Sequence, residues 1–230
     1  MTDSITNFRR VSSPGQVGQQ LASTLTRHLQ AGERVVWFLT GGAGIAVAVA
    51  ASQALTGTSL KNLTVSLSDE RFGPVGHADS NWFQLEQAGF HLPGAQLEPV
   101  LINKDLEATV EHYDQLLRKC LEAADFAIGL FGIGPDGHIA SLFPGFPQLH
   151  ETQAFATSVD NSPKPPPIRV TMTVPAIEKL DEAVVYTLGE AKWPQVDKLA
   201  TDVSIDEQPA QILKRIPKLT VYNDHKGDSL

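Results

Sequence analysis

Cysteine is nearly absent from this chain, since Cys120 is the only one among 230 residues. An intrachain disulfide is therefore excluded, which is typical of a protein from a reducing compartment. The segment from Met1 to Gln16 lacks the apolar run of a signal peptide, and we expect none. These two absences predict a cytoplasmic protein.

An excess of positive charge is also missing. The chain has 18 Lys and Arg residues against 26 Asp and Glu, which gives a formal net charge of -8. Such a surface repels nucleic acid and anionic membranes, so neither is an expected partner. An acidic protein that binds an anionic small molecule needs a local pocket of basic side chains.

Several site patterns are missing as well. The seven histidines are scattered, with neither a His-Glu-x-x-His pattern nor a cysteine cluster, so no metal site is expected. The Gly-x-Ser-x-Gly pattern of a serine-hydrolase nucleophile turn is absent too. The chain shows no internal repeat and no low-complexity tract.

One long uncharged stretch is present, from Val35 to Leu60, and it has enough residues to span a bilayer. However, Gly41, Gly42 and Gly44 interrupt it early, and polar residues punctuate the rest. A buried strand, a glycine turn and a buried helix explain this stretch better than a membrane span does.

Helix and strand patterns alternate along the chain. Apolar residues at helical spacing predict one long helix after Ser13-Pro14 and another from Leu106 to Ala124. Strands are predicted at residues 35–39, 63–67, 126–131, 168–174, 183–187 and 219–222, and further helices at 43–54, near Lys192 and at 209–215. This order predicts one α/β domain over residues 1–230, with a mostly parallel sheet covered by helices on both faces. Such sheets bind ligands beyond the carboxyl ends of their strands.

The first candidate segment is the glycine-rich turn Thr40–Gly44, between a predicted strand and a predicted helix. Glycines let backbone N–H groups approach an anion, and the N-terminus of the helix adds a favourable dipole, so a phosphate is the natural ligand. A tight turn without a ligand explains the segment equally well, and both interpretations stay open here. A dinucleotide fingerprint is disfavoured, because Val47 occupies the place of its third glycine.

The second candidate segment follows the strand predicted at 63–67. Asp69, Glu70 and Arg71 come directly after this strand, and His77, Asp79, Ser80 and Asn81 come soon after them. Runs of this kind are usually solvated loops, and the segment alone favours that interpretation. The alternative is a polar rim that orients a sugar.

The third candidate segment, Gly132–Gly145, is rich in glycine and follows the strand predicted at 126–131. It presents His138 at the predicted start of a short helix, with Asp136 two residues earlier, where the carboxylate can orient or stabilise the imidazole. Histidine titrates near neutral pH and suits a general base that activates water. A capping aspartate with an incidental histidine is the alternative, but the position and the density of glycines favour a functional site.

Two cationic residues complete the set. Arg169 begins a predicted strand after the Pro-rich loop Ser162–Pro167, and Lys192 ends the tetrapeptide Gly-Glu-Ala-Lys. Each residue alone is typical of a surface charge. Together they would supply the positive pocket that a phosphate requires in an acidic protein.

These segments, in this order, resemble the 6-phosphogluconolactonase family. The similarity extends from about Val35 to Tyr222, and the segment around His138 is its most specific part. The matching segments are Ser68–Arg71, His77–Asn81, Gly132–Gly145 and Arg169–Thr173, followed by Lys192, Pro209-Ala210, Pro217 and Leu219. The chain departs from the family in its first loop, which usually reads Ser-Gly-Gly-Ser-Thr-Pro and here reads Thr-Gly-Gly-Ala-Gly-Ile.

The resemblance implies a Rossmann-like α/β fold and the hydrolysis of 6-phospho-D-glucono-1,5-lactone in the oxidative pentose phosphate pathway. It implies that His138 is the catalytic base that activates water, that Asp136 supports it, and that no cofactor takes part. The substrate is then a small sugar-phosphate lactone. The substrate-binding residues that the resemblance implies are Thr40, Gly41, Gly42, Asp69, Arg71, Arg169 and Lys192.

Two other functions are compatible with parts of the pattern. Glucosamine-6-phosphate deaminases and isomerases share the Asp-Gly-His turn, but they tend to carry Phe-Asn-Glu-Pro shortly after it, whereas Ala140–Pro144 contains no acid. A non-catalytic sugar-phosphate-binding module needs no base, so the presence of both His138 and Asp136 argues against it. In each case we expect a monomer or a small homo-oligomer.

Overall fold

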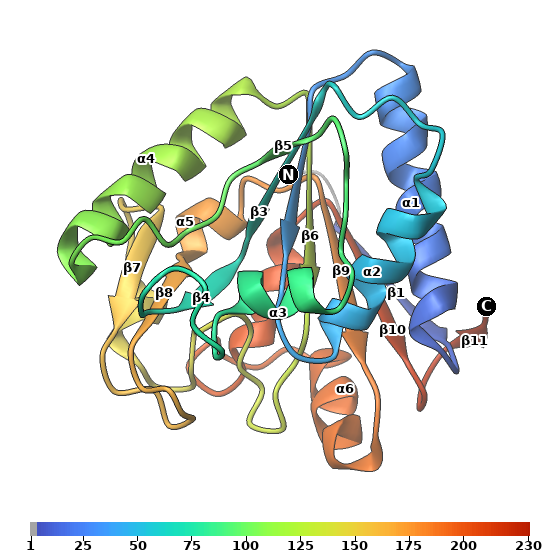
Figure 1. The fold of residues 1–230 in the computed structure, drawn as a ribbon. Helices are drawn as coiled ribbons and strands as arrows, with labels where there is room; N and C mark the ends of the chain where they lie inside the picture. The colour runs from blue at the N-terminus through green and yellow to red at the C-terminus, as the bar shows by residue number, and fades with distance from the viewer. Residues whose placement is uncertain (1–3) are drawn as a thin grey trace.

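Most strands of the protein form one parallel sheet. The structure is a computed structural model that describes residues 4–230. Eight strands pair in the order β11-β1-β10-β9-β6-β2-β3-β5, and every neighbouring pair is parallel (Figure 1). Their bounds are β1 Ile5–Arg10, β2 Val35–Leu39, β3 Leu63–Leu67, β5 Gln96–Leu97, β6 Phe126–Phe131, β9 Glu182–Thr187, β10 Lys218–Asn223 and β11 Asp228–Ser229. The predicted parallel sheet is confirmed.

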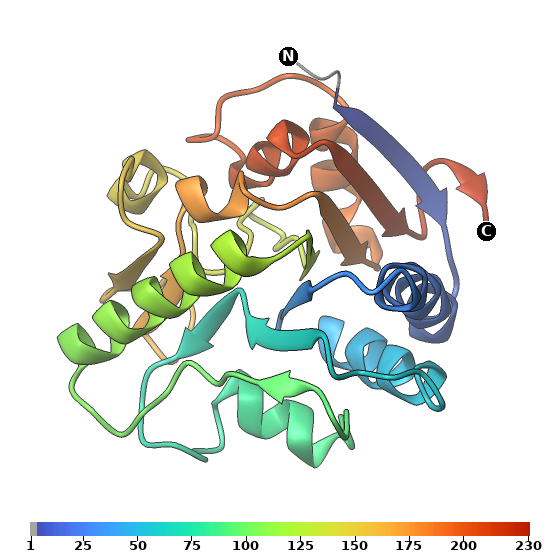
Figure 2. The same ribbon diagram turned by 90° about the horizontal axis from the view of Figure 1, so that it is seen from above.

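Helices cover both faces of this sheet (Figure 2). The helices α1 (Pro14–Gln30) and α2 (Gly44–Ala54) lie on one face, and α4 (Leu106–Ala123) and α5 (Val174–Ile177) lie on the other. The remaining helices are α3 (Asn81–Gln87), α6 (Trp193–Leu199) and three 3₁₀ segments at Pro147–His150, Glu190–Lys192 and Pro209–Arg215. The predicted α/β layering is therefore confirmed.

The packing of α1 follows from its sequence. Its residues at fourfold spacing, including Val17 and Leu21, are buried as expected, because they occupy one helix face. Gly18 lies on the same face, where an added Cβ would come within 2.6 Å of the Cβ atom of Ala50 in α2. The absence of a side chain at Gly18 lets α1 and α2 pack closely on one another and on the sheet.

A second, smaller sheet was not predicted. It contains three antiparallel strands in the order β4 (Asp69–Arg71), β8 (Arg169–Met172) and β7 (Ala156–Val159). The strand expected at 168–174 is present as β8, but it is shorter than predicted and belongs to this sheet instead of the parallel one. It ends early because Val174-Pro175 begins α5, where proline suits the first turn of a helix.

The uncharged stretch from Val35 to Leu60 folds as β2, a glycine turn and α2. None of the helices in the described part of the chain has both the length and the apolar character required to cross a membrane. Strand β1 was missed at the sequence level because it is a short, half-polar strand near the sheet margin. Its Ile5 side chain, for example, is exposed.

Candidate active site

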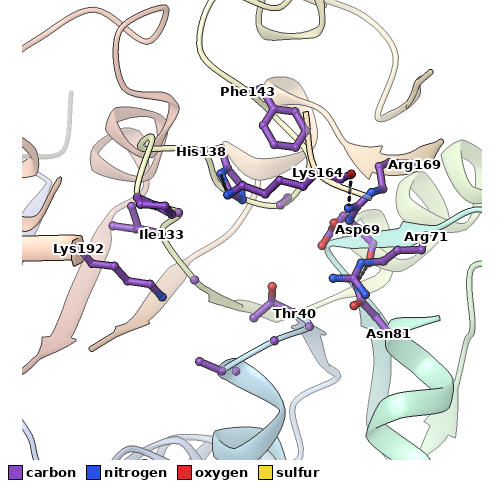
Figure 3. Close-up of a pocket in the computed structure, with 18 of the residues that line it drawn as sticks. Thr40, Asp69, Arg71, Asn81, Ile133, His138, Phe143, Lys164, Arg169 and Lys192 are labelled. Carbon is purple, nitrogen blue, oxygen red and sulfur yellow. Dashed lines mark hydrogen bonds between the residues drawn. The ribbon is translucent and has the colours of Figure 1, made fainter. Parts of the chain in front are cut away.

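A cleft of about 330 Å³ opens at the carboxyl ends of the parallel strands (Figure 3). The turns after β2 and β6 and the segment after β9 line it together with strands β4 and β8 of the small sheet. The structure brings eight of the predicted site residues to this cleft: Thr40, Gly41, Gly42, Asp69, Arg71, His138, Arg169 and Lys192. The ninth, Asp136, contacts His138 and is not among the residues that line the cleft.

His138 lies in a turn and does not begin a helix, so that prediction is wrong. Gly137 has φ +88° and Ala140 has φ +47°, and a right-handed helix cannot contain such left-handed residues. The turn closes on itself, because the Gly134 N–H donates to the carbonyl of His138 at 2.9 Å. The glycines thus form a loop that carries the imidazole to the cleft.

The imidazole of His138 is held by its neighbour Asp136. Its Nδ1 is hydrogen-bonded to Asp136 Oδ1, and the ring lies against Phe143 with 4.8 Å between ring centroids. Gly134 leaves room for this pair, since an added Cβ would collide with the imidazole. With Nδ1–H donated to the carboxylate, Nε2 carries the lone pair that a general base requires.

The carboxyl group of Asp136 stays ionised in this arrangement. Burial by itself raises its pKa, but the hydrogen bond from His138 and the charges of His138 and Lys164 outweigh burial and bring the pKa well below its usual value. An ionised Asp136 accepts a hydrogen bond from Nδ1–H, and its negative charge stabilises a positive charge that develops on the imidazole. The pair can therefore accept a proton from water.

The turn Thr40–Gly44 places backbone N–H groups at the start of α2, beside the cleft. Gly42 has φ +59°, which favours glycine. Gly41 packs directly against the side-chain amide of Asn81, which leaves no space for a Cβ. The first turn of α2 contains no acidic residue, so its dipole favours an anion.

Asp69 and Arg71 reach the cleft from strand β4. Asp69 is 4% exposed, and its Oδ2 accepts a hydrogen bond from Ser141 Oγ at 2.7 Å. Arg71 donates from Nη1 to the carbonyl of Asp79 at 2.8 Å, while its buried Nε has no partner among the described residues. These groups provide acceptors and donors suited to sugar hydroxyls.

Glu70, between these two residues, has a structural role. Its carboxylate is fully buried and accepts hydrogen bonds from the backbone N–H groups of Arg71, Asn81 and Trp82 and from Ser80 Oγ, at 2.6 to 3.0 Å. Burial, partly offset by these bonds, raises the pKa of Glu70. Glu70 thereby fastens the start of α3 to β4.

Replacing Glu70 by Gln should destabilise the protein by about 3 kcal/mol. Both carboxylate oxygens accept from N–H donors, so the NH₂ group of Gln would face a donor and leave it unsatisfied. Urea denaturation measures the loss. Glu86→Gln, at an exposed position of the same helix, is the matched control and should change stability by less than about 0.5 kcal/mol. Equal stabilities for the two variants would contradict this role.

The two predicted cations differ in their surroundings. Arg169 is 5% exposed, and its Nε donates to the carbonyl of Pro166 at 2.7 Å. Its Nη2 donates to the carbonyls of Lys164 and Pro165 at 3.1 and 3.0 Å, so Nη1 alone remains for a ligand. The pKa of Lys192 is lowered, first by burial and then by the nearby positive charge of Lys164. A bound anion would offset both effects.

Sequence reasoning missed Lys164. It lies in the Pro-rich loop that precedes β8, and its side chain extends toward His138 (Figure 3). Its Nζ is 3.3 Å from His138 Nδ1 and 3.7 Å from Asp136 Oδ1. In the sequence, the prolines are the distinguishing feature of this loop. The sequence does contain a signal for it, because Lys164 lies in the loop that leads directly into the predicted strand carrying Arg169. With Lys164, Lys192 and two arginines, the cleft supplies the basic pocket that an acidic protein needs for an anionic ligand.

The fold and the cleft together define an α/β enzyme with a His–Asp pair in a basic pocket. Comparison with known families is consistent with this. The model of the family described as glucosamine-6-phosphate isomerases/6-phosphogluconolactonase matches residues 12–221. The chain therefore belongs to this family.

Individual relatives carry the second of these names. A 6-phosphogluconolactonase of Bos taurus is 30% identical, covering 88% of this chain and 84% of the relative, and one of Mycobacterium leprae is 34% identical, covering 77% of each. The solved 6-phosphogluconolactonase of Thermotoga maritima superposes with a TM-score of 0.83 at 20% identity, over 95% of this chain and 99% of that one. A monomeric glucosamine-6-phosphate deaminase superposes with a TM-score of 0.74 at 22% identity, over 94% of this chain and 96% of that one. Lactonases and deaminases thus share this fold, so only the residues of the site can distinguish the two activities.

Proposed function

We propose that the chain is a 6-phosphogluconolactonase, which hydrolyses 6-phospho-D-glucono-1,5-lactone to 6-phospho-D-gluconate. The observation that carries this proposal is the imidazole of His138, oriented by Asp136 at the edge of a cleft lined by four cations. The names of the sequence relatives support the same activity.

In the proposed reaction, His138 Nε2 removes a proton from a water molecule, and the water oxygen attacks the lactone carbonyl. The negative charge that develops on the carbonyl oxygen is stabilised by N–H donors of the cleft, for which backbone groups and Arg71 are available. The bond between the carbonyl carbon and the ring oxygen then breaks. The imidazolium returns its proton to that oxygen, which leaves a hydroxyl and a carboxylic acid, and the acid then releases its proton to solvent at neutral pH to give the carboxylate.

The phosphate of the substrate is assigned to the turn Thr40–Gly44 with Lys192 and Arg169. Backbone N–H groups at the start of α2, the Lys192 ammonium and the free Nη1 of Arg169 provide donors and positive charge. Asp69 and Arg71 are assigned to the hydroxyl groups of the sugar. Holding the phosphate fixes the carbonyl near the activated water, which reduces the entropic cost of the attack.

The deaminase alternative requires a carboxylate soon after the histidine of the turn. Here Ala140 and Phe143 line the cleft at that place. Among the described residues that line the cleft, only Asp69 on β4 carries a carboxylate. Ring opening and deamination of an amino sugar would lack their second acid at that place. The arrangement therefore favours hydrolysis of a lactone.

The proposal is tested with two substrates in parallel. We expect the purified protein to accelerate the loss of 6-phosphogluconolactone, followed by proton release, and to release no ammonia from glucosamine 6-phosphate. The spontaneous hydrolysis of the lactone is subtracted with a protein-free sample. Ammonia release, or thermal stabilisation by the phosphorylated sugar without turnover of the lactone, would instead indicate a deaminase or a binding module.

The wider setting is proposed on sequence grounds. The small-molecule lactone is the proposed partner, neither nucleic acid nor membrane is expected to bind a chain of net charge -8, and residues 1–230 are taken as one domain. The single cysteine supports a cytoplasmic location. The chain is proposed to act as a monomer or a small homo-oligomer.

A further inference from the structure

We infer that Lys164 is a positioning residue for the reaction, which acts through its ammonium group on the proton affinity of His138. This inference rests on the proposed role of His138 as base. The relevant contacts lie on the Nδ1 side of the imidazole, opposite the nitrogen assigned to water activation. They place three charged or titratable groups together: Asp136, His138 and Lys164.

The loop that carries Lys164 is held firmly. Arg169 donates to the carbonyls of three successive residues of the loop, Lys164 among them. Ser162 closes the other side, since its hydroxyl donates to the Lys164 carbonyl at 2.9 Å and accepts from the Lys164 N–H at 3.2 Å. A backbone fixed in this way directs the lysine side chain to His138 with little loss of conformational freedom. Arg169 therefore also serves to place Lys164.

The contact between Lys164 Nζ and His138 Nδ1, at 3.3 Å, is a charge contact. Nδ1 donates its proton to Asp136 Oδ1, so it has no lone pair for the ammonium. The ammonium is instead an ionic partner of the same Asp136 oxygen, at 3.7 Å. Asp136 Oδ1 is thus shared between the imidazole and the lysine.

This sharing has a chemical consequence. A histidine and a carboxylate alone form a stable imidazolium–carboxylate pair, and an imidazolium is not a base. The charge of Lys164 already neutralises Asp136, so with a neutral imidazole the three groups carry no net charge. When His138 takes a proton, the three groups together acquire a net charge of about +1. This positive charge appears at the same time as the negative charge on the carbonyl oxygen of the substrate. The ammonium of Lys164 therefore opposes protonation of His138 and favours return of the proton to the leaving ring oxygen.

The test compares Lys164→Met with the wild-type enzyme over about pH 5 to 8. Removing the ammonium makes the imidazolium easier to form, so the acid limb of the kcat profile should move to higher pH by about one unit. At the acid end this is a loss of about tenfold in kcat, and on the neutral plateau the loss should be much smaller. The ionisation of the substrate phosphate affects both proteins equally. Lys164→Arg, which keeps the charge, should restore most of the wild-type profile.

Two further measurements separate the possible outcomes. Lys179→Met, an exposed lysine before the opposite end of β9, removes one charge outside the cleft and should leave the profile unchanged. In free protein, the NMR titration midpoint of the His138 ring should also rise in Lys164→Met, and this holds whatever the substrate is. A KM increase equal at all pH values, with an unmoved ring titration, would overturn the inference and assign Lys164 to binding alone. The two failures can be told apart. Wild-type turnover by His138→Ala would overturn the proposed role of His138 as base, whereas a raised midpoint of the His138 ring in Lys164→Met would still show that Lys164 acts on the imidazole.

Discussion

His138→Ala should lower kcat by about 10²-fold or more, the usual contribution of a general base. The variant loses the imidazole whose Nδ1 is bonded to Asp136, while the cationic side chains that line the cleft remain. We therefore expect KM to change much less than kcat. The measurement is proton release from the lactone near neutral pH, with the spontaneous rate subtracted.

The matched control is His150→Ala. The side chain of His150 is 61% exposed and pairs with Asp206 on the surface, so its loss should leave turnover near the wild-type value. Wild-type turnover in His138→Ala would show that another group activates the water. Loss of activity in both variants would point to a general effect of removing a histidine.

Asp136→Asn should lower kcat by about 10²-fold while leaving the fold intact. An amide is close to a carboxylate in shape, but it carries no charge to stabilise the imidazolium, and its NH₂ group can face Nδ1 and hold the wrong tautomer. Steady-state kinetics with the lactone measure the effect. Asp202→Asn is the control, since Asp202 is a highly exposed partner of Lys214 outside the cleft. A variant of Asp136 with unchanged kcat would limit the role of the carboxylate to packing.

The parallel sheet was predictable because its central strands are continuous apolar runs, such as Val35–Leu39 and Phe126–Phe131, all of whose residues are buried. The small sheet was not. Asp69–Arg71 is a run of three charged residues whose strand geometry comes only from pairing with Arg169–Thr171. Pairing between segments so far apart in the sequence leaves no local periodicity to read.

The site was predictable where chemistry and glycine spacing coincide. The His138 turn was predicted from its glycines and its place after a buried strand, whereas the turn Thr40–Gly44 and the charged run after β3 were assigned to the site through the family resemblance. The expected helix at His138 failed because Gly137 and Ala140 adopt positive φ, which the sequence signals only weakly. Lys164 was missed because a Pro-rich loop has no hydrophobic pattern to indicate which way its side chains point.

The two sheets divide the work of the cleft. The imidazole and the glycine turn stand on loops of the large parallel sheet, whereas Asp69, Arg71 and Arg169 belong to the small antiparallel one. The two are nevertheless joined, because Ser141, three residues after His138, donates hydrogen bonds to Asp69 of β4 and to Thr171 of β8. We therefore expect substitutions in β4 or β8 to require compensating changes in the turn that carries His138.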